Sequence, residues 1–247
     1  MVKKISVKKE EAGSAAIDKT IEEMAAAGIH LGHRVSRLHP KMEKYVIGIK
    51  NTVHIINLEK TRERLQEALN FIETLVREGK EIMFVGTKPP LRGVVKEIAE
   101  ACGAPYIVER WVGGVFTNFN VIAKRLEHLK ELERKKAEGF FDQLSKKGKA
   151  RKEKELAALE KKFGGIKNLG KIPEVVFICD LKKDHSCLKE AKRKGVKTVA
   201  LVHTNVDPEM VDYPIPANDD AISSVRYVLE KIKETIQAVR SSGQERK

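Results

Sequence analysis

The chain has 247 residues, and 48 Lys plus Arg stand against 35 Asp plus Glu, so its formal net charge is +13 and its sequence pI is about 9.5. A content of 41% hydrophobic residues is enough for a buried core, which excludes a disordered basic tail. The three cysteines are widely spaced with no CxxC pair, which argues against a disulfide framework or a cysteine zinc site. The apolar runs are much shorter than the ~20 residues that span a bilayer. We therefore expect a folded, cytoplasmic protein with a polyanionic partner.

The amino-terminal part of the chain is predicted to go from flexible to ordered. Residues 1–16 are basic and lack an apolar period, so a flexible lead is expected there. Apolar residues at helical spacing predict a helix over residues 17–27 that stops at Gly28. After an irregular loop, two β-branched runs at 45–49 and 53–56 predict a hairpin with its turn at Lys50-Asn51.

The central and carboxyl-terminal parts alternate between strand and helix patterns. Asn57 is a suitable N-cap for a long amphipathic helix that closes at Gly79. Another helix is predicted to start at Pro89-Pro90, and the last one follows residues 218–220. Short apolar strands are predicted at residues 81–85, 106–108, 174–179 and 197–202. This alternation indicates an α/β fold, a mostly parallel sheet with helices on both faces.

One segment, residues 124–162, breaks the alternation. It has narrow leucine stripes on either side of a glycine-containing interruption, a pattern typical of an antiparallel two-helix hairpin with arms ~22 Å long. It carries 14 basic and 8 acidic residues, so its net charge is 14 − 8 = +6. We expect residues 118–163 to project from a globular domain formed by residues 17–117 and 164–240, with a flexible tail over 241–247.

The loop after Gly28 combines histidines with cations. His30 and His33 have a spacing that suits a metal, but two histidines without further ligands are a weak metal signal. Contacts to phosphates tolerate loose spacing, so RNA backbone binding is the favoured interpretation, and a solvated basic loop is the alternative. The cations concerned are Arg34, Arg37, Lys41 and Lys44.

The turn Gly86-Thr87-Lys88 follows a predicted strand and precedes a helix, where α/β folds usually bind anions. It resembles half of a phosphate-binding loop, but Pro89 follows Lys88 and the second glycine of the motif is missing. A nucleotide-binding enzyme is therefore the alternative hypothesis. The favoured one makes Lys88 and Arg92 surface cations that contact RNA.

Trp111 lies in a glycine-rich segment that leads into the predicted hairpin. It could stack on a nucleobase, yet the chain has only 5% aromatic residues and no aromatic-basic series. We favour packing of Trp111 and Phe116 at the hairpin base, with Asn118 as the N-cap of the first hairpin helix.

Polar residues follow two of the later strands. Because the ends of parallel strands meet at one sheet edge, Asp180 and His203 could share a divalent ion, whereas turn capping by Asp180 and Asn205 is the alternative. No other cofactor is expected. We find no nucleophile elbow, HExxH or Ser/His/Asp pattern, so the chain is not predicted to be an enzyme.

Taken in order along the chain, several of these motifs resemble the bacterial small-subunit ribosomal protein number two family, from about Ile17 to Val239. They are Gly28–His33, Pro40–Met42, Val53–Thr61, Phe84–Lys88, Arg110–Gly114 with Thr117–Asn118, Gly164–Ile166, Thr204–Asn205 with Asp207–Pro208, and Ile215–Ala221.

The resemblance implies a Rossmann-like or flavodoxin-like domain with a protruding coiled-coil hairpin, placed between the head and body of the small subunit. Its implied partners are ribosomal RNA and neighbouring ribosomal proteins, including ribosomal protein number one, with this chain a monomer within the particle. Its implied role is structural support of translation. A protein-docking scaffold with a solvated hairpin is a further alternative. The cations expected to contact RNA are Arg34, Arg37, Lys41, Lys44, Lys88, Arg92, Lys135, Lys136, Lys146, Lys147 and Lys149.

Overall fold

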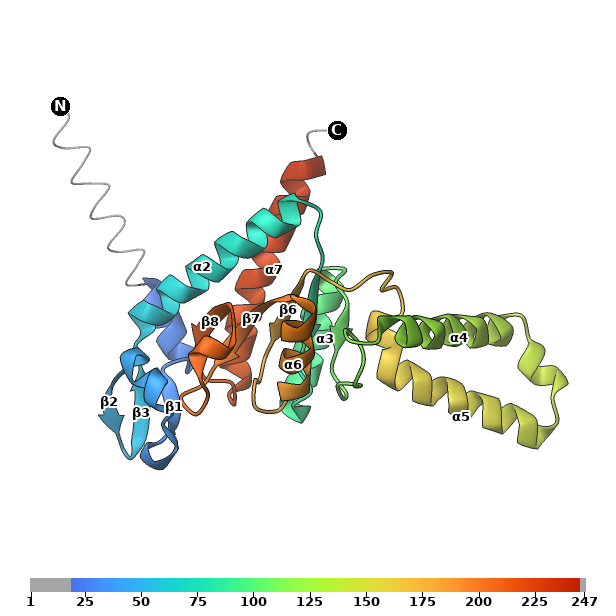
Figure 1. Cartoon of the computed structure of the whole chain (residues 1–247), viewed down its shortest axis with the longest axis horizontal. Coiled ribbons are helices and arrows are strands. Elements are labelled where there is room, and N and C mark those ends of the chain that lie inside the picture. Colours follow the sequence, from blue (N-terminus) through green and yellow to red (C-terminus); the bar gives the residue numbers. More distant parts are fainter. Residues whose placement is uncertain (1–18, 245–247) are drawn as a thin grey trace.

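The computed structural model of the chain describes residues 19–244 and contains two sheets (Figure 1). The larger sheet is parallel throughout and has the strand order β5-β4-β6-β7-β8. Its strands are β4 (Ile82–Val85), β5 (Tyr106–Ile107), β6 (Val175–Ile178), β7 (Lys197–Val202) and β8 (Tyr213–Pro216). In chain order this is 2-1-3-4-5, the flavodoxin-like arrangement, in which the order reverses between β4 and β6. The predicted α/β class is confirmed.

Helices cover both faces of this sheet, because alternate strand residues are buried against different helices. One face packs against α2 (Leu58–Arg77), α3 (Arg92–Ala101) and α7 (Ile222–Gln244) through residues such as Phe84 and Phe177. The other face packs against α6 (His185–Lys194) and the hairpin base through residues that include Met83 and Val176. The strands β4 and β6 are buried at every position, as expected for a covered parallel sheet.

The predicted helix boundaries at the first half of the sheet are close to those observed. Residues 19–26 are helical, and Gly28 has a φ of 77°. Asn57 is the N-cap of α2, and its side chain accepts from the amides of Glu59 and Lys60. The proline pair forms a short 3₁₀ turn, Pro89–Leu91, from which α3 continues.

Two predictions near the smaller sheet need correction. The segment after Gly28 is not an irregular loop throughout, because β1 (Leu31–Arg34) pairs antiparallel with β3 (Val53–Ile56). On its other side β3 pairs with β2 (Val46–Lys50). The tight turn between β2 and β3 is at Asn51-Thr52, not Lys50-Asn51, and both residues have positive φ, as a type I′ hairpin turn requires.

Strand β8 is absent from the predicted elements. It contains two of the chain's eight prolines, Pro214 and Pro216, which weaken a strand pattern. The structure places it at the edge of the sheet, paired only with β7, where missing amide donors are tolerated.

The two-helix insertion is formed by α4 (Phe119–Ala137) and α5 (Lys146–Phe163), which project from the domain (Figure 1). The 19 residues of α4 span about 28 Å at 1.5 Å per residue. The helices pack through buried residues Leu126, Leu129, Leu132 and Leu156, and Phe141 covers the connection. The helix begins directly after Asn118 as predicted, but the Asn118 side chain makes no capping hydrogen bond.

The insertion returns to the sheet through Gly165, next to the edge strand β5. A Cβ atom on Gly165 would lie 2.3 Å from the carbonyl oxygen of Tyr106 and 2.6 Å from its ring. Only glycine permits this approach, so the exit of α5 is held against β5.

The flexible lead predicted for residues 1–16 lies outside the described residues. The flexible tail predicted for residues 241–247 is helical over residues 241–244, where α7 continues. Residues 245–247 lie outside the described part. Within residues 19–244, no helix combines the length and the apolarity that crossing a membrane requires.

Candidate functional site at the carboxyl edge of the sheet

The carboxyl ends of four parallel strands bring the singled-out polar residues together. Gly86–Lys88 follow β4, Asp180 follows β6 by two residues, His203 follows β7, and residues 218–220 follow β8. In this topology the edge beside the β4–β6 reversal is where ligands usually bind.

Lys88 lies among three carboxylates at this edge. Its Nζ is 2.5 Å from Oδ1 of Asp220, 3.3 Å from Oδ2 of Asp180 and 3.5 Å from Oδ1 of Asp219. Burial by itself lowers the pKa of Lys88, but the hydrogen bond to Asp220 and the charges of Asp219 and Asp180 raise that pKa above its ordinary value. The ammonium is thus charged and neutralised within the protein. Lys88 is therefore not the free surface cation that the sequence predicts, because carboxylates of the same chain surround its ammonium.

Asp219 is the most buried of the three carboxylates, with 4% of its surface exposed. Its burial and the neighbouring charge of Asp180 raise its pKa to about 7, against the opposing effect of Lys88. Three carboxylates around one ammonium leave this edge with an excess of negative charge.

The Gly86-Thr87-Lys88 turn is not arranged to hold a phosphate. The Thr87 amide and hydroxyl both donate to the Asp184 carboxylate, at 3.2 and 2.7 Å. A Cβ on Gly86 would lie 2.7 Å from Cγ2 of Val95, so this glycine permits packing of α3 against the strand. Carboxylates occupy the positions from which a phosphate would be bound, and a nucleotide-binding enzyme is not supported.

Two histidines form a second cluster with Asp220, which also pairs with Lys88. The Nδ1 atoms of His33 and His203 are 2.8 Å apart, and Oδ2 of Asp220 is 3.8 Å from Nε2 of His33 and 3.9 Å from Nε2 of His203. His203 is 1% exposed, and burial, reinforced by His33, lowers its pKa to about 3. His203 is therefore uncharged at neutral pH.

The hydrogen bonds around the two rings assign their tautomers. The Thr204 amide donates to Nδ1 of His203, so the neutral ring carries its proton on Nε2, toward Asp220. Nδ1 of His33 must then donate to His203, and Nε2 of His33 accepts from Nδ2 of Asn205 at 3.2 Å. Asn205, His33 and His203 thus form one directed chain.

In the described residues, the side chains placed to hold a metal ion together include His203 but not Asp180, the other member of the predicted pair. Ligand atoms of His33, His203 and Asp220 lie within 4.8 Å of one another, whereas Asp180 is outside that set. Asp180 instead accepts from the amides of Lys182 and Lys183 at 2.9 and 2.8 Å, which is turn capping. Two imidazoles and a carboxylate are a donor set that zinc accepts, after a small contraction of the cluster.

The remaining cations expected to contact RNA divide into two groups. Four have carboxylate partners inside the protein: Lys41 bonds to Asp207 and Glu209, Arg92 to Glu109, Lys135 to Glu131 and Lys149 to Asp142. Six have no carboxylate partner in the described part of the chain, namely Arg34, Arg37, Lys44, Lys136, Lys146 and Lys147. Lys44 lies over the Tyr45 ring.

A buried carboxylate outside the predicted set of site residues holds the hairpin base. Glu190 of α6 accepts from Nε1 of Trp111 and from the amides of Gly114, Phe116 and Thr117, at 2.8–3.1 Å. Trp111 is 7% exposed, and its ring centroid is 5.0 Å from that of Phe116, so Trp111 packs as predicted. The available signal was a glutamate between the apolar residues Leu188 and Ala191 on the inner face of a predicted helix.

Comparison with known proteins identifies the family. The family model described as ribosomal protein S2 matches residues 24–239. The small ribosomal subunit protein uS2 of Dictyoglomus turgidum is 42% identical over 216 residues, which cover 87% of this chain and 88% of that protein. The protein of the same name from Chlorobaculum tepidum is 42% identical, and the match covers 90% of this chain and 89% of that protein. The one from Treponema pallidum (strain Nichols) is 43% identical, and the match covers 88% of this chain and 75% of that protein. The chain therefore belongs to the ribosomal protein S2 family.

Proposed function

We propose that the chain is a structural, non-catalytic constituent of the small ribosomal subunit and that it contacts ribosomal RNA through cations at its two ends. The observation that carries this proposal is the position of the six cations without carboxylate partners. Arg34, Arg37 and Lys44 lie in or beside the smaller sheet, and Lys136, Lys146 and Lys147 lie near the tip of the hairpin. These regions are at opposite ends of the long axis (Figure 1).

Free cations favour the RNA backbone because neutralised phosphates release their counterions. A cation already paired with a carboxylate gains less from a phosphate, since the existing pair must be broken. Among the paired cations, Lys88 and Arg92 are also the least exposed, with 22% and 34% of their side chains accessible, and we leave them out of the proposed contact set. The more exposed pairs of Lys41, Lys135 and Lys149 are easier to break, so these three lysines stay in the set as secondary contacts.

The proposal is tested by the salt dependence of binding to small subunits that lack this protein. The variant Lys136→Glu/Lys146→Glu/Lys147→Glu is expected to weaken binding and to lower the slope of log affinity against log salt by about 2 to 3. The matched control is Lys80→Glu/Lys171→Glu/Lys197→Glu, because these exposed lysines already pair with Glu78, Glu174 and Asp212. Equal salt slopes for the two variants, or no binding by the wild-type chain, contradict the proposal.

The finer placement rests on the family. We propose that the chain lies between the head and body of the subunit as one copy in a cytoplasmic particle, with neighbouring ribosomal proteins that include ribosomal protein number one. Two cationic ends suit contact with several segments of a folded RNA.

We also propose that His33, His203 and Asp220 bind one divalent ion, for which zinc is the probe. The supporting observations are the ligand atoms within 4.8 Å and the excess of carboxylates at this edge. Calorimetric titration of the metal-free chain with zinc should give one site that is lost in His203→Ala and Asp220→Asn. It should be retained in His128→Ala, whose surface histidine pairs with Glu155. Absence of zinc binding by the wild-type chain contradicts this assignment.

A further inference from the structure

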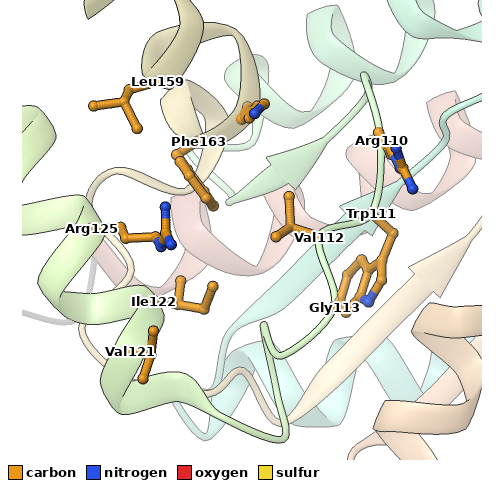
Figure 2. Close-up of a pocket in the computed structure, with 10 residues that line it drawn as sticks. Arg110, Trp111, Val112, Gly113, Val121, Ile122, Arg125, Leu159 and Phe163 are labelled. Carbon is orange, nitrogen blue, oxygen red and sulfur yellow. The ribbon is translucent and has the colours of Figure 1, made fainter. Parts of the chain in front are cut away.

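A hollow of about 390 Å³ lies at the base of the hairpin. Its walls come from three segments: residues 110–113 before α4, the first turns of α4, and the last turns of α5 (Figure 2). None of its lining residues belongs to the site at the carboxyl edge of the sheet. We call it the hairpin-base groove.

The floor of the hairpin-base groove is apolar. Val112, Ile122 and Phe163 face one another across it from the three segments (Figure 2). Ile122 and Phe163 are almost fully buried, at 3% and 2% exposure, whereas Val121 on the wall is 45% exposed. Val112 and Leu159 are half-buried, so together with Val121 they leave part of the apolar lining open to solvent.

Three cations surround this apolar floor without a carboxylate. Arg110, Arg125 and Lys162 are exposed, and none of them has a hydrogen bond or ion pair within residues 19–244. Figure 2 shows Arg125 reaching into the space from α4.

Nearby cations outside the hairpin-base groove, in contrast, are paired with carboxylates. Lys161 is 3.7 Å from Glu109, and Lys167 is 3.3 Å from Glu133. Glu109 and Glu133 are therefore used on the neighbouring surface. The cations at the groove are left uncompensated.

The walls are unsuited to a nucleobase. No side-chain amide or hydroxyl lines the hairpin-base groove, so only its three cations could donate to the edge of a base, and none of the lining side chains could accept from one. The Trp111 ring is buried against Phe116 and its Nε1 is bound to Glu190, so its face is not available for stacking. An apolar side chain fits this floor better than a base does.

We propose that the hairpin-base groove binds a segment of a neighbouring protein in which an apolar side chain is flanked by Asp or Glu. The apolar side chain fills the floor, and the carboxylates pair with Arg125, Lys162 and Arg110. This inference rests on the proposed function, because the neighbour is another protein of the small subunit. It adds a protein-binding surface to a chain whose free cations elsewhere suit RNA.

The test places a photo-crosslinker in the groove of the full chain. Val121 is replaced by p-benzoylphenylalanine, the protein is bound to small subunits that lack it, and the irradiated product is mapped by mass spectrometry. We expect a crosslink to an apolar residue with Asp or Glu within one helical turn, in a ribosomal protein. The control position is Phe140, which is equally exposed at 44% but lies at the hairpin connection, and it should not give this crosslink.

Charge reversal supplies the second arm. Arg125→Glu/Lys162→Glu should lower the crosslink yield about tenfold or more, since two charge-assisted contacts turn repulsive. Lys130→Glu/Lys154→Glu makes the same charge change on the same two helices at exposed, unpaired positions, and should leave the yield within about twofold.

The outcomes separate this inference from the proposed function. Crosslinks to RNA or to a segment without carboxylates, no crosslink, or equal effects of the two charge reversals overturn the groove assignment while the chain still binds the particle. If the Val121 variant does not fold, the crosslinker is placed at Leu159 on the opposite wall, where the same crosslink is expected. Failure of the wild-type chain to bind small subunits overturns the proposed function itself.

Discussion

Glu190 and Trp111 are joined by a hydrogen bond of 3.0 Å from the indole Nε1 to Oε1 of the buried carboxylate. Because Glu190 is on α6 and Trp111 precedes α4, the bond connects a helix of the sheet domain to the start of the insertion. The same carboxylate accepts three backbone amides and the Thr117 hydroxyl. One side chain thus fixes the course of residues 111–117.

Removal of this carboxylate should destabilise the protein. In Glu190→Ala, several buried donors lose their acceptor, so we expect the free energy of unfolding to fall by about 3 kcal/mol. Glu127→Ala, at an exposed position without an ion pair, is the control and should change it by less than about 0.5 kcal/mol. Urea denaturation of both variants measures the difference, and equal midpoints contradict the role assigned to Glu190.

The same residue predicts a pH dependence. Burial raises the pKa of Glu190, but the hydrogen bonds from Gly114, Trp111, Thr117 and Phe116 outweigh burial and lower that pKa below its ordinary value. A lowered folded-state pKa means that the stabilisation is present above the unfolded pKa of ~4.3 and is lost as the pH falls through the folded value. The stability difference between wild type and Glu190→Gln should therefore be large at pH 7 and shrink in acid. A pH-independent difference contradicts the prediction.

Gly165 should not tolerate a methyl group. Gly165→Ala would place Cβ 2.3 Å from the Tyr106 carbonyl oxygen, so the exit of α5 must move away from β5. We expect a loss of about 1 to 3 kcal/mol in thermal or urea unfolding, the range of an overpacked core. Gly170→Ala has open space around its Cβ and serves as the control. Similar unfolding midpoints for the two alanine variants contradict this account.

Lys88 should stabilise the carboxyl edge through charge compensation. Lys88→Met leaves Asp180, Asp219 and Asp220 without their ammonium, and we expect a loss of about 3 kcal/mol. Asp219→Asn should recover part of that loss in the double variant, because it removes the most buried of the three charges. A double-mutant cycle in urea measures the coupling. Strictly additive effects count against the electrostatic explanation.

Local signals predicted the framework well. Asn57 caps α2 as the sequence indicates, and the β7 pattern over Lys197–Val202 agrees with the observed strand. Apolar strand runs and the glycines that end helices depend only on residues a few positions apart, so both can be recognised in the sequence. Strand β8 was missed because Pro214 and Pro216 are unfavourable in most strands and tolerated only at an edge.

The site was harder to predict because its contacts join distant segments. Lys88 and Asp220 are 132 positions apart, so the sequence shows a free lysine where the fold makes an ion pair. His33 lies in β1, whose amide at His33 donates to the Thr204 hydroxyl beside His203, whereas the sequence predicts an irregular loop there. The role of Glu190 is hidden in the sequence for the same reason, since its hydrogen-bond donors come from a segment more than 70 positions earlier.

The separation between the two cationic ends has a consequence for assembly. The sheet lies between them, and Glu190 and Gly165 fix how the insertion leaves it, so the distance between the ends is set by the fold. A bivalent ligand of fixed span binds best to sites already held at that span, because mobile sites must be ordered at an entropic cost. The chain should therefore bind more tightly to RNA whose distant helices are already in place. It should bind more weakly to the same RNA before that RNA has folded.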